Sequence, residues 1–257
     1  MSFTPRLAAA VLSVAVCSHA AEDKKEESKT PPPKVTATIP FALSPGITNT
    51  FKVRGLTLTN ATALRFLPNT NLSAHIKSRG KVKVPEKADA KTVGDTELEV
   101  ELVLPADFPA GALSFFVATP EGDTPTNALY IGPRDGLFEE KEPNGGFRNA
   151  NPIQIPQIIR GVIEAAADVD VFRLQARARE TLHLETLGGR YGSPIDAIVS
   201  VHDATGHTLL TCDDTRGSPD PSFDFSVPAD GTYLVSIMDA HDRGGENFNY
   251  LLMITRK

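Results

Sequence analysis

Short stretches of alternating apolar and polar residues, separated by proline and glycine, run through most of the chain. The clearest lies within residues 97–104, where Glu97, Glu99 and Glu101 alternate with apolar side chains. Successive side chains of a strand point to opposite faces, so this segment predicts a half-buried antiparallel strand. Comparable segments predict further strands at 35–39, 50–54, 63–67, 113–119 and 129–131.

The second half of the chain gives the same signal. Residues 203–206, Asp-Ala-Thr-Gly, separate two alternating runs and predict a β-hairpin. Residues 173–184 are rich in Ala, Arg and Glu, as a helix would be, but the residues from Phe172 alternate between apolar and polar and favour strand. Late strands are expected at 233–238 and 250–254. The predicted fold class is therefore all-β.

The N-terminus has the pattern of an export signal. Arg6 precedes an apolar run over residues 7–16, and Ser18-His19-Ala20 supplies the small residues that a signal peptidase requires. Ten apolar residues cannot cross about 30 Å of hydrocarbon, so no transmembrane segment is expected after removal of the signal. We interpret residues 1–20 as a signal peptide and 21–34 as a charged, proline-rich, disordered linker.

Composition and charge narrow the class of protein. The chain has 257 residues, of which 40% are hydrophobic, and a formal charge of −6, enough for two small cores in an exported protein. Residues 133–257 hold 19 acidic and 12 basic residues, which makes nucleic acid an unsuitable partner. Cys212 is the only cysteine after signal removal, so no intramolecular disulfide is expected.

Residues 35–132 resemble an immunoglobulin-like domain of the IPT/TIG type. The resemblance is carried by Phe51-Lys52-Val53-Arg54-Gly55-Leu56, Ala63-Leu64-Arg65-Phe66, the segment 104–111 and Val117-Ala118-Thr119-Pro120-Glu121-Gly122. It implies an Ig-like β-sandwich that acts as a spacer or contact module. The polar stretch 81–94 departs from the pattern as an insertion, and no fixed structure is assigned to it.

Residues 147–257, after an acidic inter-domain linker at 133–146, resemble a bacterial pre-peptidase C-terminal (PPC) domain. This resemblance implies a jelly-roll-like β-sandwich of the kind attached to secreted proteases. The segments that carry it, in order along the chain, are 142–144, 161–163, 168–174, 192–196, 201–206, 213–214 and 228–233.

Two acidic segments have the composition of a calcium site. Glu140, Glu142 and Asn144 alternate along an extended stretch, and Asp168 and Asp170 follow about twenty-five residues later. Calcium prefers six to eight oxygen ligands, and closely spaced carboxylates repel one another unless a cation or solvent separates them. The residues therefore predict a shared calcium site. The alternative is that Asp168 and Asp170 flank a turn and 142–144 caps the linker.

The PPC resemblance implies the same site. Calcium in relatives attached to collagenases joins the acidic lead-in to the loop before the second strand, and Glu140, Glu142, Asn144 and Asp170 match those ligand positions. Gly145 and Ala167 stand where that family has acidic ligands, so the site here would be weaker, rearranged through Asp168, or absent.

A second acidic group comprises Asp196, Asp213 and Asp214, with Asp220 further along. These residues could hold another ion, or their carboxylates could accept backbone N–H bonds and fix turns. Asp favours turns for that reason, and the turn role is the expectation.

Known catalytic motifs are absent from the sequence. There is no Gly-x-Ser-x-Gly elbow, no His-Glu-x-x-His helix and no phosphate-binding glycine loop, and the histidines stand singly at positions expected to be surface or hairpin sites. No catalytic residue is therefore assigned, and a non-enzymatic role is predicted.

The function predicted is that of a secreted, periplasmic or cell-envelope binding protein. A calcium-stiffened sandwich would recognise an extracellular polymer or an envelope protein, with Tyr191 and Tyr250 as candidate contact aromatics. The alternative is an accessory or regulatory module of a secreted protease or other hydrolase.

Overall fold

The computed structural model describes Met1 and residues 31–257, apart from 69–70, 85, 87–88 and 216. The predicted signal peptide at 1–20 and most of the charged linker at 21–34 lie outside these described residues. The fold is all-β, as predicted from the alternating pattern, and consists of two sandwiches of two sheets each.

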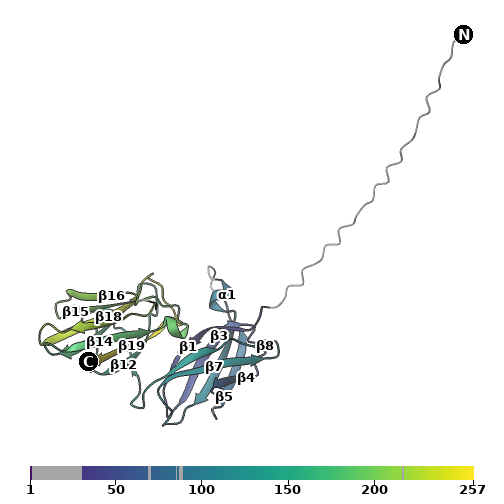
Figure 1. Cartoon of the computed structure of the whole chain (residues 1–257), viewed down its shortest axis with the longest axis horizontal. Coiled ribbons are helices and arrows are strands. Elements are labelled where there is room, and N and C mark those ends of the chain that lie inside the picture. Colours follow the sequence, from purple (N-terminus) through teal and green to yellow (C-terminus); the bar gives the residue numbers. More distant parts are fainter. Residues whose placement is uncertain (2–30, 69–70, 85, 87–88, 216) are drawn as a thin grey trace. The chain divides into compact units, whose positions relative to one another are not determined.

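The first sandwich holds the strands of residues 34–131 (Figure 1). Its sheets bury one core between them, centred on residues such as Phe51, Val100 and Phe115. One sheet has the order β1 (Lys34–Ile39), β3 (Thr48–Leu56), β6 (Thr96–Val103), β5 (Ala74–Lys81). The other has the order β2 (Ala42–Leu43), β9 (Asn127–Ile131), β7 (Gly111–Thr119), β4 (Ala63–Leu67), with β8 (Gly122–Asp123) paired to β7.

The alternation in β6 sorts its side chains as the sequence indicated. Leu98, Val100 and Leu102 are fully buried in the core. The intervening carboxylates lie on the outer face, where Glu99 and Glu101 pair with Lys77 of β5. Strand β5 was not predicted, because its polar side chains hide the alternation expected of a half-buried strand.

The polar insertion at 81–94 contains a short helix, α1 (Ala90–Val93). The Asp89 side chain caps it by accepting a hydrogen bond from the backbone N–H of Lys91 at 2.9 Å. A part of the insertion, to which no structure was assigned from the sequence, is thus a short helix.

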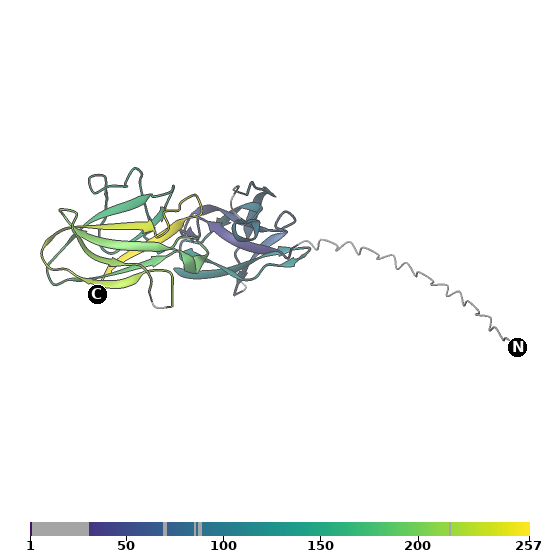
Figure 2. The ribbon, with the colours of Figure 1, turned by 90° about the horizontal axis from the view of Figure 1, so that it is seen from above.

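The second sandwich is drawn from teal-green to yellow in Figure 2. It consists of two five-stranded sheets, and its core includes Phe172, Ile237 and Leu252. One sheet has the order β10 (Phe138–Glu139), β12 (Gln157–Val162), β19 (Asn249–Arg256), β14 (Thr181–Leu187), β17 (Ser222–Ser226). The other has the order β11 (Asn151–Pro152), β13 (Val169–Ala176), β18 (Gly231–Asp239), β15 (Ala197–Asp203), β16 (Thr208–Cys212), and a 3₁₀ turn, η1 (Gly189–Tyr191), follows β14. The segment at 133–146 expected as a linker therefore contributes β10 to this sandwich.

Two ambiguous segments of the second sandwich are strands. Of residues 173–184, which could be read as a helix, 173–176 belong to β13 and 181–184 to β14, and a turn at 177–180 joins the two strands. The hairpin predicted at 203–206 joins β15 to β16, and the Asp203 carboxylate holds its turn by accepting from the backbone N–H groups of Thr205 and His207. Alternation thus outweighed helix propensity where both were present.

Residues 31–257 cluster as one compact unit, and a small apolar contact within it joins the sandwiches. We call this contact the joint; its fully buried members are Phe41, Ala42, Leu187 and Leu251. Polar bonds surround it: the Phe41 N–H donates to Asn249 Oδ1 at 3.2 Å, and Glu246 pairs with Lys52 and Arg54 at 3.0 and 2.6 Å. Lys52 lowers the pKa of the Glu246 carboxyl, which keeps that charge in place.

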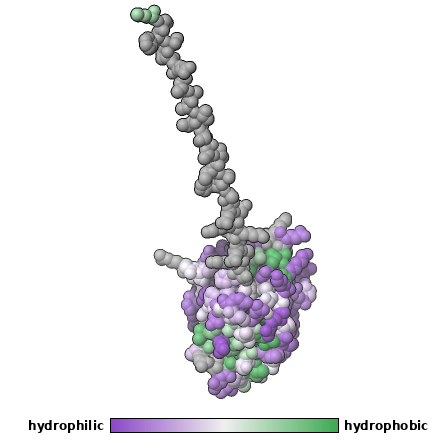
Figure 3. Space-filling model, turned by 90° about the vertical axis from the view of Figure 1, so that its right-hand side faces the viewer, coloured by the Kyte–Doolittle hydropathy of each residue, from purple (hydrophilic) through white to green (hydrophobic). Residues whose placement is uncertain are grey.

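Hydrophobic side chains at the surface are scattered. On the face that Figure 3 shows, green hydrophobic patches are interspersed with purple hydrophilic ones. The large apolar residues exposed in the folded part are Ile47, Leu67, Val103 and Phe147. Among the described residues, none of the helices has the length and apolar character needed to cross a bilayer.

Candidate metal centre

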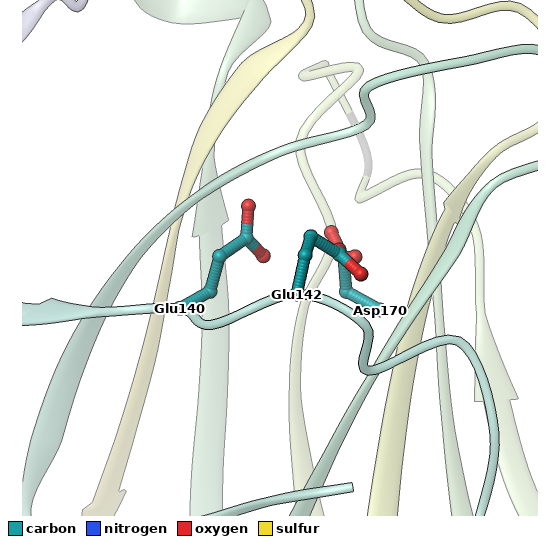
Figure 4. Close-up of side chains that lie close together, drawn as sticks. All are labelled: Glu140, Glu142 and Asp170. Atoms are coloured by element: carbon teal, nitrogen blue, oxygen red, sulfur yellow. The ribbon is translucent and has the colours of Figure 1, made fainter. Parts of the chain in front are cut away.

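Three carboxylates from two distant segments meet beside β12. Glu140 and Glu142 follow β10, and Asp170 lies on β13. One carboxylate oxygen from each lies within 4.8 Å of the others. Figure 4 shows Glu140 and Glu142 rising from the same side of the acidic segment, with the Asp170 carboxyl close to that of Glu142. The structure therefore brings together three of the five predicted ligands.

A buried tyrosine hydroxyl links two of these carboxyls. Tyr250 Oη lies 2.9 Å from Glu140 Oε2 and 2.7 Å from Asp170 Oδ2, and the Tyr250 side chain is fully buried. The other Glu140 oxygen accepts from the backbone N–H of Val162. A single hydroxyl proton cannot satisfy two carboxylates, so the group is short of positive charge or protons.

Burial makes this shortage costly. It raises the pKa of Asp170 to about 10, with repulsion from Glu140 as the second cause. Burial also raises the pKa of Glu140, although the bonds from Val162 and Tyr250 oppose it. Glu140 and Asp170 are neighbouring carboxyls whose pKa values are both raised, so the site binds either protons or a cation.

The polar atoms nearby that lack partners support a cation. Asn144 is fully buried, and neither Oδ1 nor Nδ2 has a hydrogen-bond partner among the described residues; Asp170 Oδ1 is in the same condition. The Asn144 backbone N–H donates to Glu142 Oε2 at 2.8 Å, which holds that carboxylate at the site. Carboxylate and amide oxygens are the ligands calcium prefers, so the donor set of Glu140, Glu142, Asn144 and Asp170 fits this ion.

Asp168 does not belong to this group, and its inclusion in the predicted ligand set is corrected here. Its Oδ2 accepts from the backbone N–H of Glu164 at 2.7 Å and so holds the turn before β13. Ala167 lies in that turn with a φ of 61°. The sequence spacing could not distinguish a turn-forming carboxylate from a ligand, because both roles place Asp next to the strand.

Gly161 is required for the geometry of the site. It lies opposite Tyr250 in the pairing of β12 with β19, and a Cβ there would lie 2.3 Å from Tyr250 Oη and 2.5 Å from Glu140 Oε2. We expect Gly161→Ala to lower the free energy of unfolding by about 2 kcal/mol, because either side chain must move. Urea denaturation measures this change, and Gly231→Ala, where the space is open, is the control. Equal losses in both variants would show that Tyr250 is not held against Gly161.

The second acidic group also assembles. Carboxylate oxygens of Asp196, Asp213 and Asp214 lie within 4.8 Å of one another, and Asp196 Oδ2 lies 3.3 Å from His241 Nδ1. Burial and the charges of Asp214 and Asp196 raise the pKa of Asp213. Asp213 and Asp214 are exposed, so solvent screens the repulsion between these charges. The expected turn role applies instead to Asp220, whose carboxylate accepts from the N–H groups of Gly188, Gly189 and Arg190.

Asp239, which sequence reasoning missed, has the same kind of role. It is 1% exposed and accepts from the backbone N–H groups of Asp196, His241 and Arg243. Burial alone would raise its pKa, but Arg243 and these N–H groups lower it to about 2. The available signal was an Asp at a strand end four residues before an Arg.

Asp239 predicts a stability change at low pH. Because its folded-state pKa lies below the ordinary 3.8, ionised Asp239 stabilises the fold above about pH 4, and this contribution is lost as the pH falls to about 2. Asp239→Ala is expected to cost about 2 kcal/mol at neutral pH and to flatten the stability curve between pH 4 and 2. Asp107→Ala, at an exposed aspartate with no side-chain hydrogen bond or ion pair among the described residues, is the control in acid titrations followed by circular dichroism. An unchanged curve in Asp239→Ala would contradict this role.

The two predicted contact aromatics have different positions. Tyr250 is fully buried and cannot contact an external ligand, so that prediction is wrong; its apolar strand places it in the core. Tyr191 is partly exposed beside the joint, where its ring stacks on Phe41. His202, expected at the surface, is 8% exposed, and its ring nitrogens lie 3.0 and 2.9 Å from the hydroxyls of Thr208 and Ser236.

Comparison with solved structures gives likenesses of low sequence identity. The PPC domain of a collagenase from Bacillus anthracis is 15% identical, with a TM-score of 0.33 over 41% of this chain and 94% of that one. The secreted serine protease VesC from Vibrio cholerae is 10% identical, with a TM-score of 0.30 over 84% of this chain and 49% of that one.

Comparison with known sequences gives matches to part of the chain. It is 28% identical over 99 residues to a probable subtilase-type serine protease of Deinococcus radiodurans, and the match covers 37% of this chain and 14% of that protein. The resemblance of residues 35–132 to the IPT/TIG type stays a prediction. Residues 168–237, within the second sandwich, match the model of the bacterial pre-peptidase C-terminal domain, the family that the motifs of this region resemble.

Proposed function

We propose that this chain is an exported, non-catalytic binding protein whose second sandwich is stiffened by calcium. The observation that supports this is the pair of buried oxygens without partners, Asp170 Oδ1 and Asn144 Oδ1, on the two segments that bring Glu140, Glu142 and Asp170 together. A bound calcium ion would satisfy these oxygens and offset the repulsion that burial amplifies. Glu140, Glu142, Asn144 and Asp170 would be its protein ligands.

Calcium would stiffen the lead-in to the second sandwich. Glu140 and Glu142 lie on the segment that connects the sandwiches, whereas Asp170 lies on β13 within the sheet. An ion shared between them would fix this connection, and the exposed surface would then recognise an extracellular polymer or an envelope protein. The protein would work by presenting a rigid surface, because rigidity lowers the entropy lost on binding.

Isothermal titration calorimetry of the full chain with calcium tests the metal, and magnesium is the comparison ion. We expect one calcium site and weaker magnesium binding, because magnesium requires a more regular octahedron and gives up its water reluctantly. Cosedimentation with insoluble cell-envelope polymer, with calcium and with EGTA, tests recognition. Absence of calcium heat at any concentration removes the metal from the proposal, and absence of sedimentation with calcium removes polymer recognition.

A second candidate function is that of an accessory module of a secreted hydrolase. The observation that favours it is the 99-residue match to a probable serine protease, of which this chain covers 14%. Affinity purification of the tagged chain from its native culture medium would distinguish the two functions. Stoichiometric recovery of one hydrolase favours the accessory role.

A further inference from the structure

A cavity of about 290 Å³ opens beside the joint, where the first sandwich meets the loop after β14. We call it the seam pocket. Its volume is close to the lower limit of small-molecule sites, about 300 Å³. Its lining comes from three parts of the chain. These are β1 (Val35, Thr36, Ala37, Thr38), Ser114 of β7 with the residues that enter β9 (Thr126, Asn127, Ala128), and η1 with the residue after it (Arg190, Tyr191, Gly192).

Side-chain hydroxyls without partners are concentrated in this lining. Among the described residues, the hydroxyls of Thr38, Ser114, Thr126 and Tyr191 make no hydrogen bond within the chain. Thr38 is only 4% exposed. Thr126 is exposed, and of the described residues the hydroxyl oxygens of Thr38, Ser114 and Tyr191 are not among the enclosed side-chain atoms without partners, so all four are open to solvent and free to bind a ligand. Each can both donate and accept, which matches the hydroxyl groups of a sugar.

The charges at the pocket favour a neutral ligand. Arg190 is the charged residue in the lining, and Asp220 and Glu185 already pair with it at 2.9 and 2.6 Å. A carboxylated or sulfated ligand would therefore meet one arginine charge and two carboxylates just behind it. Arg190 Nη1 makes no hydrogen bond within the described part of the chain and remains a donor for a neutral oxygen.

The aromatic ring in the lining is held in a fixed position. Tyr191 stacks on Phe41 with centroids 5.1 Å apart and an interplanar angle of 11°, and Tyr130 meets it nearly at right angles, with centroids 6.0 Å apart. A rigid, partly exposed ring provides apolar area at little entropic cost. The C–H face of a pyranose ring packs on such a surface.

An extended peptide fits the site less well. Strand addition requires a free edge, and β1 is an edge strand. However, a Cβ built on Gly192 would lie 3.9 Å from the Thr36 carbonyl oxygen, so the end of η1 covers this edge at the pocket. A peptide strand could not continue along β1 past that point.

We infer that the seam pocket binds one neutral sugar unit of a glycan, through the free hydroxyls, Arg190 Nη1 and the Tyr191 ring. This inference rests on the proposed recognition role and names the class of polymer recognised. It differs from the calcium site in its residues, so the two can be tested separately.

Calorimetry of the full chain with soluble hexasaccharides of glucose, mannose, xylose and N-acetylglucosamine tests the inference. At least one hexasaccharide should bind. Thr38→Val and Ser114→Ala should each lower the affinity for that sugar about three- to tenfold, and Tyr191→Leu should lower it about tenfold. Ser226→Ala, an exposed serine on β17, is the matched control and should leave the affinity unchanged. Thermal melts show whether each variant is folded.

Other outcomes would overturn the inference. The first is that no neutral hexasaccharide binds. The second is that folded Thr38→Val and Ser114→Ala bind the sugar with the affinity of the wild type. The third is that hexagalacturonate binds more tightly than the neutral hexasaccharides. Binding of casein-derived peptides in place of sugars would assign the pocket to a peptide. In each case calcium binding and polymer cosedimentation would still report on the proposed function separately.

Discussion

Saturating calcium is expected to raise the melting temperature of the wild-type chain by about 10 °C, and Asp170→Asn is expected to remove this rise. A ligand present at 100 to 1,000 times its Kd stabilises the folded state by about 3–4 kcal/mol. In EGTA the Asp170→Asn chain should melt above the wild type, because the amide removes the cost of burying the Asp170 carboxyl next to Glu140. Differential scanning calorimetry of both chains in calcium and in EGTA measures all four values.

Asp168→Asn is the matched control for this experiment. Its carboxylate holds the neighbouring turn and lies outside the cluster of Glu140, Glu142 and Asp170. The Asp168→Asn substitution is expected to change the melting temperature by the same amount in calcium and in EGTA. An Asp170→Asn chain that gains as much from calcium as the wild type would place the ion elsewhere.

Phe41→Ala should cost about 3–5 kcal/mol and separate the unfolding of the two sandwiches. Phe41 is 1% exposed at the joint, where it packs with Leu187, Leu251 and the Tyr191 ring. Removing a buried Phe side chain loses its transfer free energy and leaves a cavity. Since the joint is small, we expect its loss to convert a single calorimetric transition into two.

Phe66→Ala provides the comparison for Phe41→Ala. Phe66 is 5% exposed in the core of the first sandwich and does not belong to the joint. Its removal should destabilise the chain by a similar amount and leave one transition. A single transition in Phe41→Ala at the wild-type width would show that the joint does not couple the sandwiches.

The strands were largely predictable because their information is local. Each alternating run in the first sandwich, such as 97–104, coincides with a strand to within two residues at each end. Strand β5 was missed because its residues are mostly polar, and it is stabilised by pairing with β6 instead of by an apolar face of its own. Such pairing is long-range information.

The site was predictable only in part, for the same reason. The spacing of Glu140, Glu142 and Asn144 places their side chains on one face of an extended segment, which is a local property. That Gly161 pairs with Tyr250, and that the Tyr250 hydroxyl reaches Asp170, depends on the register of β12 and β19. The joint depends likewise on Phe41 and Tyr191, which are far apart in the sequence.

Neighbouring residues at the start of β19 have consequences for folding fidelity. The Asn249 side chain accepts from the Phe41 N–H, and the next residue, Tyr250, reaches the acidic group from the core. Displacement of this strand by one position would put Phe248 or Tyr250 where Asn249 belongs, and Asn249 or Leu251 where Tyr250 belongs, so both partners would be left unmatched. Misaligned chains would therefore lose two anchors at once, which should limit the accumulation of aggregation-prone intermediates during folding.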